Sequence, residues 1–138
     1  MSNMKLHSHF HSVYDINLHL VLVTKYRRKC ITKEMHQELK AIIDRLMKDK
    51  DLILVEYGGE QDHIHVLFST HLNINLSRFV NSIKTVSSRL IRKKYATHLS
   101  KFYWKPYFWS RSYCVVSSGG APIEVIKTYI QKQGKYKT

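Results

Sequence analysis

Cysteine, proline and acidic side chains are all scarce in this chain of 138 residues. Its two cysteines, Cys30 and Cys114, are too few for a disulfide framework, so we expect reduced thiols in a cytoplasmic protein. No linker or repeat interrupts the sequence, which predicts one domain over residues 1–138 with a loose, His-rich arm at residues 1–12. The apolar run 18–23 is far too short to span a bilayer, and no signal peptide is expected.

The shortage of acidic residues leaves a strongly basic protein. Lysine and arginine number 23 against 10 aspartates and glutamates, which gives a formal charge of +13. Such an excess predicts a polyanionic partner, most often nucleic acid, with a merely basic or ribosome-like surface as the alternative. A phosphate-binding loop of the Gly-x₄-Gly-Lys-Ser/Thr type is also missing, so nothing in the sequence suggests ATP-driven chemistry.

Periodic hydrophobic residues predict four strands and three helices. Residues 15–24 alternate between apolar and polar positions, which is typical of a strand, whereas the residues after Thr32 repeat with helical spacing. The order β-α-β-β-α-β plus a terminal helix predicts an α+β fold of the ferredoxin-like split type, an antiparallel sheet with two helices on one face. So small a sheet makes a dimer reasonable. The expected strands are 15–24, 52–57 (ended by Gly58-Gly59), 63–68 and 112–117, and the expected helices are 32–46, 75–95 and 122–133.

Two histidines on the third predicted strand form the clearest chemical motif. His63 and His65 flank Ile64, so their imidazoles point to the same face of the strand. Two neutral imidazoles are half of a divalent-metal site, although surface or packed histidines can have the same spacing. Asp62 and Glu60 lie close enough to hydrogen-bond to a metal ligand and orient it, although most exposed acidic side chains do not. Three further histidines in the N-terminal arm, at positions 7, 9 and 11, are expected to bind metal weakly or not at all.

The last predicted helix carries a second pair of candidate functional residues. Tyr129 and Gln133 are four residues apart and therefore neighbours on one face. A tyrosine hydroxyl can attack phosphorus to form a covalent intermediate, and a glutamine oxygen can join two histidines around Mg²⁺ or Mn²⁺. An amphipathic helix with a tyrosine on its rim is the structural alternative.

Basic and aromatic residues gather in three places. Clusters of positive charge suit contacts with phosphates, and aromatic rings among lysines resemble a platform on which unpaired bases stack. Such aromatics are also often buried, so we expect Trp109 to point inward and one or two others to remain available. The candidate DNA-binding residues are Lys25, Arg27, Arg28, Lys29, Lys84, Arg89, Arg92 and Lys93, and the aromatic segment is 101–109.

Taken together, these motifs resemble the single-tyrosine HUH transposases (TnpA-type) of the smallest bacterial and archaeal insertion sequences. One departure is Val23-Thr24, where relatives often carry Trp and Cys, but it affects no proposed catalytic residue. The resemblance extends from about residue 12 to 133 and rests on 25–29 (KYRRK), 62–65 (DHIH), 82–90 (SIKTVSSRL), 108–113 (FWSRSY), 119–122 (GGAP) and 129–133 (YIQKQ).

The resemblance implies a specific activity. Tyr129 would be the nucleophile, and His63, His65 and Gln133 would hold the metal. The substrate would be single-stranded DNA with hairpins near the element ends, cut to leave a 5′-phosphotyrosine and a free 3′-OH. The protein would be a homodimer with composite active sites, each taking its tyrosine helix from the other subunit.

Three alternatives remain open on the sequence alone. A non-catalytic nucleic-acid-binding domain would explain the charge and the aromatics but not the His63, His65, Tyr129 and Gln133 set. A histidine-triad nucleotide hydrolase would need a third alternating histidine where Leu67 stands. A domesticated relative would cut hairpins in host repeats without transposing.

Overall fold

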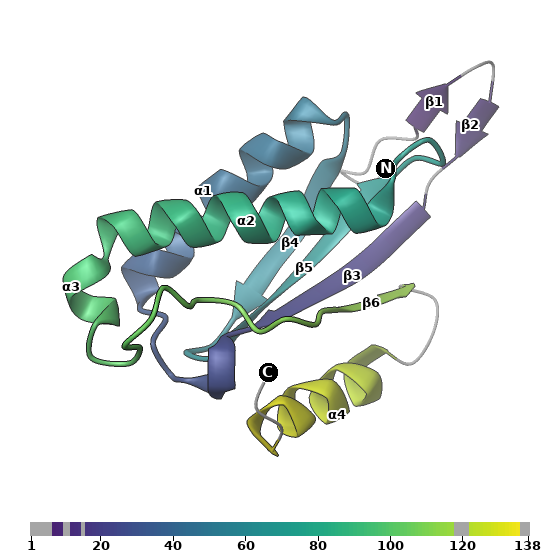
Figure 1. Cartoon of the computed structure of the whole chain (residues 1–138). Helices are drawn as coiled ribbons and strands as arrows, with labels where there is room; N and C mark the ends of the chain where they lie inside the picture. Colours follow the sequence, from purple (N-terminus) through teal and green to yellow (C-terminus); the bar gives the residue numbers. More distant parts are fainter. Residues whose placement is uncertain (1–6, 10–11, 15, 118–121, 136–138) are drawn as a thin grey trace.

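The computed structural model describes residues 7–9, 12–14, 16–117 and 122–135. Its centre is a four-stranded antiparallel sheet in the order β4-β5-β3-β6, which confirms the predicted α+β plan (Figure 1). The strands are β3 (Ile16–Val23), β4 (Ile53–Gly59), β5 (His63–Thr70) and β6 (Cys114–Ser117). The helical elements are η1 (Lys25–Arg27), α1 (Lys33–Asp49), α2 (Leu76–Lys94), α3 (Ala96–Leu99) and α4 (Pro122–Lys135).

The structure differs from the sequence predictions in a few local features. Where a loose arm was expected, β1 (His7–His9) pairs with β2 (Ser12–Tyr14) as a small separate hairpin. Gly58 and Gly59 belong to β4 instead of ending it, because both pair with β5. The short helix α3 was not predicted, and β6 begins at Cys114 instead of residue 112. Residues 119–121, the first three of the GGAP motif, lie outside the described residues.

Polar caps fix the starts of the two long helices where the sequence placed them. The Thr32 hydroxyl accepts a hydrogen bond from the Met35 backbone N–H at 3.1 Å. The Asn75 side-chain oxygen accepts one from the Arg78 N–H, also at 3.1 Å. Each cap satisfies a backbone donor that has no partner inside the helix, which stabilises a helix by about 1 kcal/mol.

The hydrophobic core lies between one face of the sheet and the pair α1 and α2. Alternate residues of β3 and β5 point into it, as the period-two pattern predicted. Both helices contribute apolar side chains at three- and four-residue spacing. The core residues on the sheet include Leu20, Leu22, Ile64, Val66 and Phe68, and those on the helices include Met35, Leu39, Ile43, Phe79, Val80 and Ile83.

The opposite face of the sheet carries the histidine pair. In the β3–β5 register, His65 lies across from Val21 and His63 across from Val23, and Val21 also lies across from Cys114 of β6. Directly opposed residues share a face, so these side chains point away from α1 and α2. The helix α4 lies on this second side, next to β3, β6 and η1 (Figure 1). Val21 and Val23 are therefore fully buried although they are not part of the main core.

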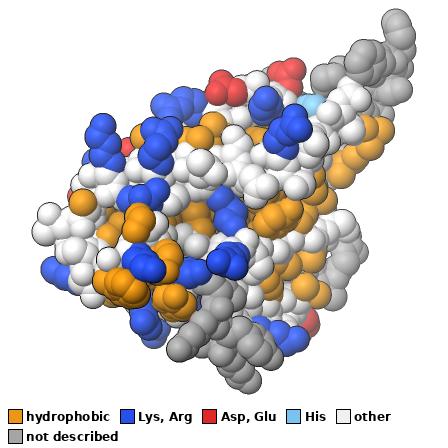
Figure 2. Space-filling view, in the orientation of Figure 1, with side chains coloured by type: hydrophobic (Ala, Val, Ile, Leu, Met, Phe, Trp, Pro, Cys, Tyr) orange, Lys and Arg blue, Asp and Glu red, His pale blue; other side chains and the backbone are white. Residues whose placement is uncertain are grey.

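The surface reflects the basic composition. Figure 2 shows lysine and arginine side chains scattered over this face of the molecule, with few acidic groups and several hydrophobic groups between them. Within the described part of the chain, no helix is both long enough and apolar enough to cross a membrane.

Candidate active site

His63 and His65 stand side by side on β5. Their ring centroids are 6.5 Å apart, and the ring planes differ by 26°. Burial lowers the pKa of His65 below its usual value, and the neighbouring His63 and His19 lower it further. His65 is therefore neutral at neutral pH, which is the form that ligates metals. His19 shares this face of the sheet, and its buried Nδ1 has no hydrogen-bond partner among the described residues.

A glycine makes space for the His65 ring. Gly58 of β4 lies directly across from His65 in the strand register. A Cβ atom added at Gly58 would lie 2.7 Å from Nε2 of His65 and 2.9 Å from its Cε1. Because such contacts are too short for any larger residue, the missing side chain at position 58 sets where the imidazole can lie.

Asp62 fixes the orientation of the other imidazole. The Nδ1–H of His63 donates to Oδ1 of Asp62 at 2.8 Å. This bond selects the tautomer whose Nε2 is free to bind a metal, which is the usual function of a carboxylate behind a ligating histidine. Asp62 thus lies where it can orient a histidine, as the sequence suggested. Glu60 is exposed and contributes through its backbone, whose N–H donates to the His63 carbonyl at 3.0 Å.

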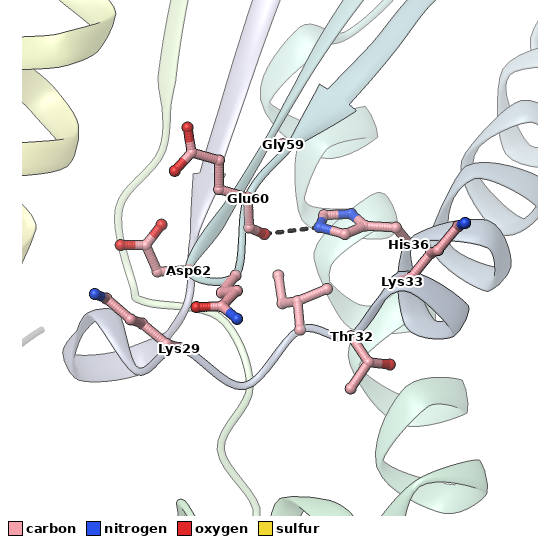
Figure 3. Close-up of a pocket in the computed structure, with 9 residues that line it drawn as sticks. Lys29, Thr32, Lys33, His36, Gly59, Glu60 and Asp62 are labelled. Atoms are coloured by element: carbon pink, nitrogen blue, oxygen red, sulfur yellow. Dashed lines mark hydrogen bonds between the residues drawn. The ribbon is translucent and has the colours of Figure 1, made fainter.

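The turn that carries Asp62 is anchored to the start of α1. A pocket of about 530 Å³ lies between them, and Lys29, Lys33, His36 and Glu60 are among the residues that line it (Figure 3). Nε2 of His36 is 2.7 Å from the Glu60 carbonyl oxygen, and its Nδ1 is 2.8 Å from the Tyr57 hydroxyl. Both His36 nitrogens are therefore occupied, so this histidine holds the turn in place.

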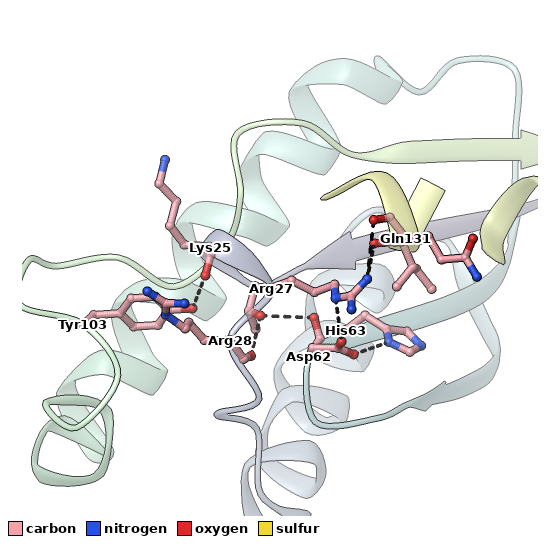
Figure 4. Close-up of polar contacts among 9 residues, drawn as sticks. Lys25, Arg27, Arg28, Asp62, His63, Tyr103 and Gln131 are labelled. Carbon is pink, nitrogen blue, oxygen red and sulfur yellow. Dashed lines mark hydrogen bonds and ion pairs between the residues drawn. The ribbon is translucent and has the colours of Figure 1, made fainter. Parts of the chain in front are cut away.

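Arg27 connects the turn to the helix that carries Tyr129. Its Nε lies 3.5 Å from Oδ2 of Asp62, and its Nη1 donates to the carbonyl oxygens of Ile130 at 3.4 Å and Gln131 at 3.5 Å (Figure 4). A cation at carbonyls near the C-terminal end of a helix also interacts favourably with the helix dipole. A single side chain thus contacts both the histidine-orienting carboxylate and α4.

The backbone that presents Arg27 has an unusual conformation. Tyr26 and Arg27 have φ angles of 59° and 53°, in the left-handed region that non-glycine residues rarely adopt. Surrounding contacts hold it: the Thr24 hydroxyl donates to the Arg28 carbonyl at 2.7 Å, and the Lys25 N–H donates to the Phe108 carbonyl at 2.8 Å. Strain of this kind concentrates at functional sites, where the fold holds a side chain in a required direction.

Tyr129 and Gln133 meet a serine of the segment before β6. The hydroxyl oxygens of Tyr129 and Ser112 are 2.8 Å apart, and the Ser112 hydroxyl donates to Oε1 of Gln133 at 3.4 Å. Either of the two hydroxyls can be the donor in the bond between Tyr129 and Ser112. The predicted i, i+4 pair does share one face, and Gln133 is buried there. Ser112 received no role in the sequence analysis, because only folding brings it to α4.

Burial raises the pKa of Tyr129 above its ordinary value. Burial has the largest effect on this pKa. The hydrogen bond with Ser112 lowers the pKa, nearby Cys114 raises it and a bond with Ser110 lowers it, but together they do not cancel the effect of burial. The phenol is therefore protonated at neutral pH in the protein alone. A nucleophile in this state needs a proton acceptor or a nearby positive charge before it attacks.

The predicted ligand set suits a small divalent cation. Within residues 7–9, 12–14, 16–117 and 122–135, no three His, Cys, Asp or Glu side chains cluster as a metal site. The Gln133 amide, the third ligand that the family resemblance implies, would supply an oxygen donor. With His63 oriented by Asp62 and His65 kept neutral, the available donors fit Mg²⁺ or Mn²⁺ with coordination positions open for phosphate oxygens.

The predicted DNA-binding residues differ in their surroundings. Nζ of Lys84 donates to the Arg111 carbonyl at 2.7 Å, and burial followed by the charge of Lys25 lowers the Lys84 pKa. Nε of Arg92 donates to the Ser88 hydroxyl at 3.0 Å. Contacts with DNA remain a prediction for the whole set. Its exposed members are Arg28, Lys29, Arg89 and Lys93.

The aromatic segment divides into buried and exposed rings. Trp109 is buried, and its Nε1–H donates to the Ser87 hydroxyl at 2.9 Å, which confirms the expected inward position. Tyr103 and Phe108 are also buried. Trp104, in contrast, is 83 % exposed.

Comparisons with known proteins agree on one family. The family model described as "Transposase IS200 like" matches residues 12–133. The ISDra2 transposase TnpA of Deinococcus radiodurans is 27 % identical over 121 residues, covering 88 % of this chain and 86 % of that protein. The transposase for insertion sequence element IS200 of Salmonella typhimurium is 28 % identical over 123 residues, covering 89 % of this chain and 80 % of that protein.

Solved structures extend the similarity to the fold. A crystal structure from Deinococcus radiodurans R1, assigned as a transposase, is similar with a TM-score of 0.83 and 28 % identity, covering 92 % of this chain and 97 % of that one. A REP-associated tyrosine transposase bound to a REP hairpin is similar with a TM-score of 0.51 and 13 % identity, covering 83 % of this chain and 62 % of that one. At that identity, the second match supports the fold alone.

Proposed function

Because this chain belongs to the IS200-like transposase family, we propose that it cleaves and rejoins single-stranded DNA at insertion-sequence ends through a 5′-phosphotyrosine on Tyr129. The main support is the contact network around α4. Ser112 binds the Tyr129 hydroxyl, and Arg27 joins the same helix to Asp62, which orients His63. A hydroxyl nucleophile and a half-buried histidine pair are thereby held on the same side of one sheet.

The covalent step uses groups of the chain itself. The Tyr129 oxygen attacks phosphorus, a new P–O bond forms, and the bond from phosphorus to the 3′ oxygen breaks. The phenol proton passes to solvent as the Tyr129 oxygen attacks, and the departing 3′ oxygen takes up a proton. Rejoining is the reverse: a 3′-OH attacks the phosphotyrosine and releases Tyr129. One phosphoester replaces another, so the cycle needs no ATP.

The metal would be held by His63, His65 and Gln133. When bound, Mg²⁺ or Mn²⁺ supplies positive charge that polarises the scissile phosphate and stabilises the leaving oxygen. The protein contributes the geometry of this site. Asp62 selects the His63 tautomer, Gly58 makes space for the His65 ring, and Ser112 orients the Gln133 oxygen.

The substrate assignment rests on charge and on the family. A net charge of +13 favours a nucleic acid, and the basic side chains can contact phosphates without reading sequence. We propose that the DNA carries hairpins near the element ends. One structural neighbour of this fold, the REP-associated tyrosine transposase, is bound to a REP hairpin.

We further propose that the protein acts as a homodimer that exchanges α4. In the structure, α4 lies against its own chain, held by Arg27 and Ser112. Exchange of an identical element between subunits recreates the same contacts, so the same residues could receive α4 from a partner. Mixing Tyr129→Phe with His65→Ala protein tests this. Recovered cleavage would show composite sites, and no recovery would show that each site is built from one chain.

A covalent adduct assay tests the activity. The probe is the DNA that flanks the gene on each side, supplied as single strands with Mn²⁺. We expect an adduct that resists denaturing electrophoresis and disappears in Tyr129→Phe, with hairpin binding retained. Tyr95→Phe is a matched control, because it removes a phenol hydroxyl at the residue that follows α2 and should leave the adduct unchanged.

A missing adduct with all such strands would favour a non-catalytic DNA-binding domain on the same fold. The flanking DNA also separates a mobile element from a domesticated enzyme. Imperfect palindromes close to both ends of the gene are expected for an insertion sequence, whereas dispersed repeats elsewhere in the genome are expected for a domesticated relative.

A further inference from the structure

We propose that Trp104, together with Tyr26 and Tyr107, forms a stacking surface for unpaired bases of the DNA strand that enters the active site. This inference rests on the proposed function, since it names where the single-stranded part of that substrate binds. We call these three residues with Lys25, Arg28 and Lys105 the aromatic surface.

Trp104 is exposed although the surrounding segment is well packed. Trp104 is 83 % exposed, whereas Tyr103, one residue before it, is buried. Nζ of Lys105 lies 4.7 Å from the centroid of the Trp104 ring. A large aromatic side chain left in water beside a cation is unfavourable for a surface without a ligand, and it suits one that stacks on bases.

Several contacts fix the loop that presents Trp104. The Tyr103 hydroxyl donates to the Lys25 carbonyl at 2.7 Å, and the Tyr107 N–H donates to the Lys105 carbonyl at 2.7 Å. Tyr107 also packs edge-to-face on Tyr26 and Tyr103, with centroid distances of 5.8 and 6.1 Å. An aromatic group held in place before binding loses little conformational entropy when a base stacks on it.

The charges of this surface complement a nucleic-acid strand. Nζ of Lys25 lies 5.0 Å from the Tyr107 centroid and 5.3 Å from that of Tyr26, and the Arg28 guanidinium lies 5.6 Å from the Tyr26 centroid. The segments 25–29 and 101–111 contain no acidic residue. Figure 2 shows hydrophobic and basic side chains intermixed near α3 and the loop that follows it. Lys25 is buried against these rings, whereas Arg28 and Lys105 are exposed and can contact phosphates beside them.

The element η1 connects the aromatic surface with the candidate active site. Lys25 and Tyr26 belong to η1, and the next residue, Arg27, contacts Asp62 beside His63. A strand whose scissile phosphate lies at the histidine pair would thus pass η1 on its way to Trp104. Stacking on an exposed ring requires a base whose faces are free, so the strand must be unpaired there.

Intrinsic fluorescence tests the proposal, because the chain has only two tryptophans and Trp109 is buried. The background is Tyr129→Phe, so that no cleavage intervenes, and the probes are a 12-nucleotide oligothymidine and a blunt DNA duplex. We expect oligothymidine to quench the emission more strongly than the duplex. Trp104→Ala should abolish the quenching and weaken oligothymidine binding on the order of tenfold, the loss of one stacked base.

Two further variants complete the test. Trp104→Phe should retain most of the affinity, because phenylalanine also stacks. Leu72→Ala removes another exposed apolar side chain, 71 % exposed, and should change nothing. Affinity of Trp104→Ala within twofold of the parent would overturn the proposal. So would a change in oligomeric state with unchanged DNA affinity, because it would identify a protein-binding surface.

The proposal and the proposed function fail in different ways. If the quenching depends on Trp104 but the wild-type chain forms no adduct, the aromatic surface is supported and the transposase chemistry is refuted. Normal adduct formation with no effect of Trp104→Ala on binding would retain the chemistry and refute the surface.

Discussion

Replacing Gly58 by alanine should impair catalysis while leaving the fold nearly unchanged. The added Cβ would lie 2.7 Å from Nε2 of His65, whereas ordinary contact begins near 3.4 Å. The imidazole must therefore move by about 0.7 Å. Its ring is the end of a side chain that can rotate, so the displacement falls on the predicted metal ligand and leaves the backbone in place.

The magnitudes separate activity from stability. Replacing a strand glycine by alanine stabilises the folded state by roughly 0.5–1 kcal/mol. An imidazole forced away from its preferred rotamer destabilises the folded state by roughly 0.5–1.5 kcal/mol. The net change in the free energy of unfolding should therefore stay within about 1 kcal/mol. Misplacement of a catalytic group by roughly 1 Å can slow a reaction on the order of 100-fold. We expect a loss of that order in the rate of DNA cleavage.

The neighbouring glycine provides the control. A Cβ at Gly59 would collide with the backbone oxygen of His63 and approach the Ile64 Cα to 2.9 Å. Backbone atoms of a paired strand cannot swing aside, so Gly59→Ala should lower the free energy of unfolding by roughly 1–3 kcal/mol. Cleavage kinetics with Mn²⁺ and thermal unfolding are measured on both variants. Full activity in Gly58→Ala, or unfolding of that variant alone, would refute the reasoning.

Three other outcomes follow from the contacts of the site. Arg27→Lys keeps the charge but loses the forked guanidinium that contacts Asp62 and α4 at the same time. The rate of cleavage should therefore fall at least tenfold, with hairpin binding retained. Equal activity in Arg27→Lys would contradict this role of Arg27. The cleavage rate should rise with pH between 6 and 9, because burial raises the Tyr129 pKa and attack needs the deprotonated oxygen. Ser112→Ala removes a bond that lowers this pKa, so its pH–rate profile should shift to higher pH, and Ser112→Thr should restore it. Raising salt from 50 to 200 mM should weaken DNA binding by at least tenfold in a filter-binding assay, and a flat response would argue against contacts with several phosphates.

The sequence predicted those features that depend on local periodicity. Alternation along β3 and β5 identified both strands and showed that His63 and His65 share a face. Helical spacing placed Tyr129 beside Gln133, and the Thr32 cap identified the start of α1. These patterns involve residues at most four positions apart, for which strand and helix geometry is nearly fixed.

Features that depend on tertiary contacts could not be predicted in the same way. Ser112 reaches Tyr129 only after β6 and α4 pack together, and Gly58 faces His65 only in the paired register. Arg27 was expected to bind DNA as a member of the basic cluster 25–29. Its contacts with Asp62 and α4 require a left-handed backbone that no sequence pattern indicated. The resemblance to a family pointed to candidate residues for catalysis, whereas the structure identifies the side chains that contact those candidates.

The most direct test of the central claim is to locate the DNA on the protein. Flanking single-stranded DNA and Mn²⁺ are incubated with the wild-type chain, the adduct is digested with trypsin, and the modified peptide is identified by mass spectrometry. We expect a 5′-phosphate bound to Tyr129 and a released strand that ends in a 3′-OH. An adduct on another side chain, or cleavage that leaves both DNA ends free, would contradict the assignment of Tyr129 as nucleophile.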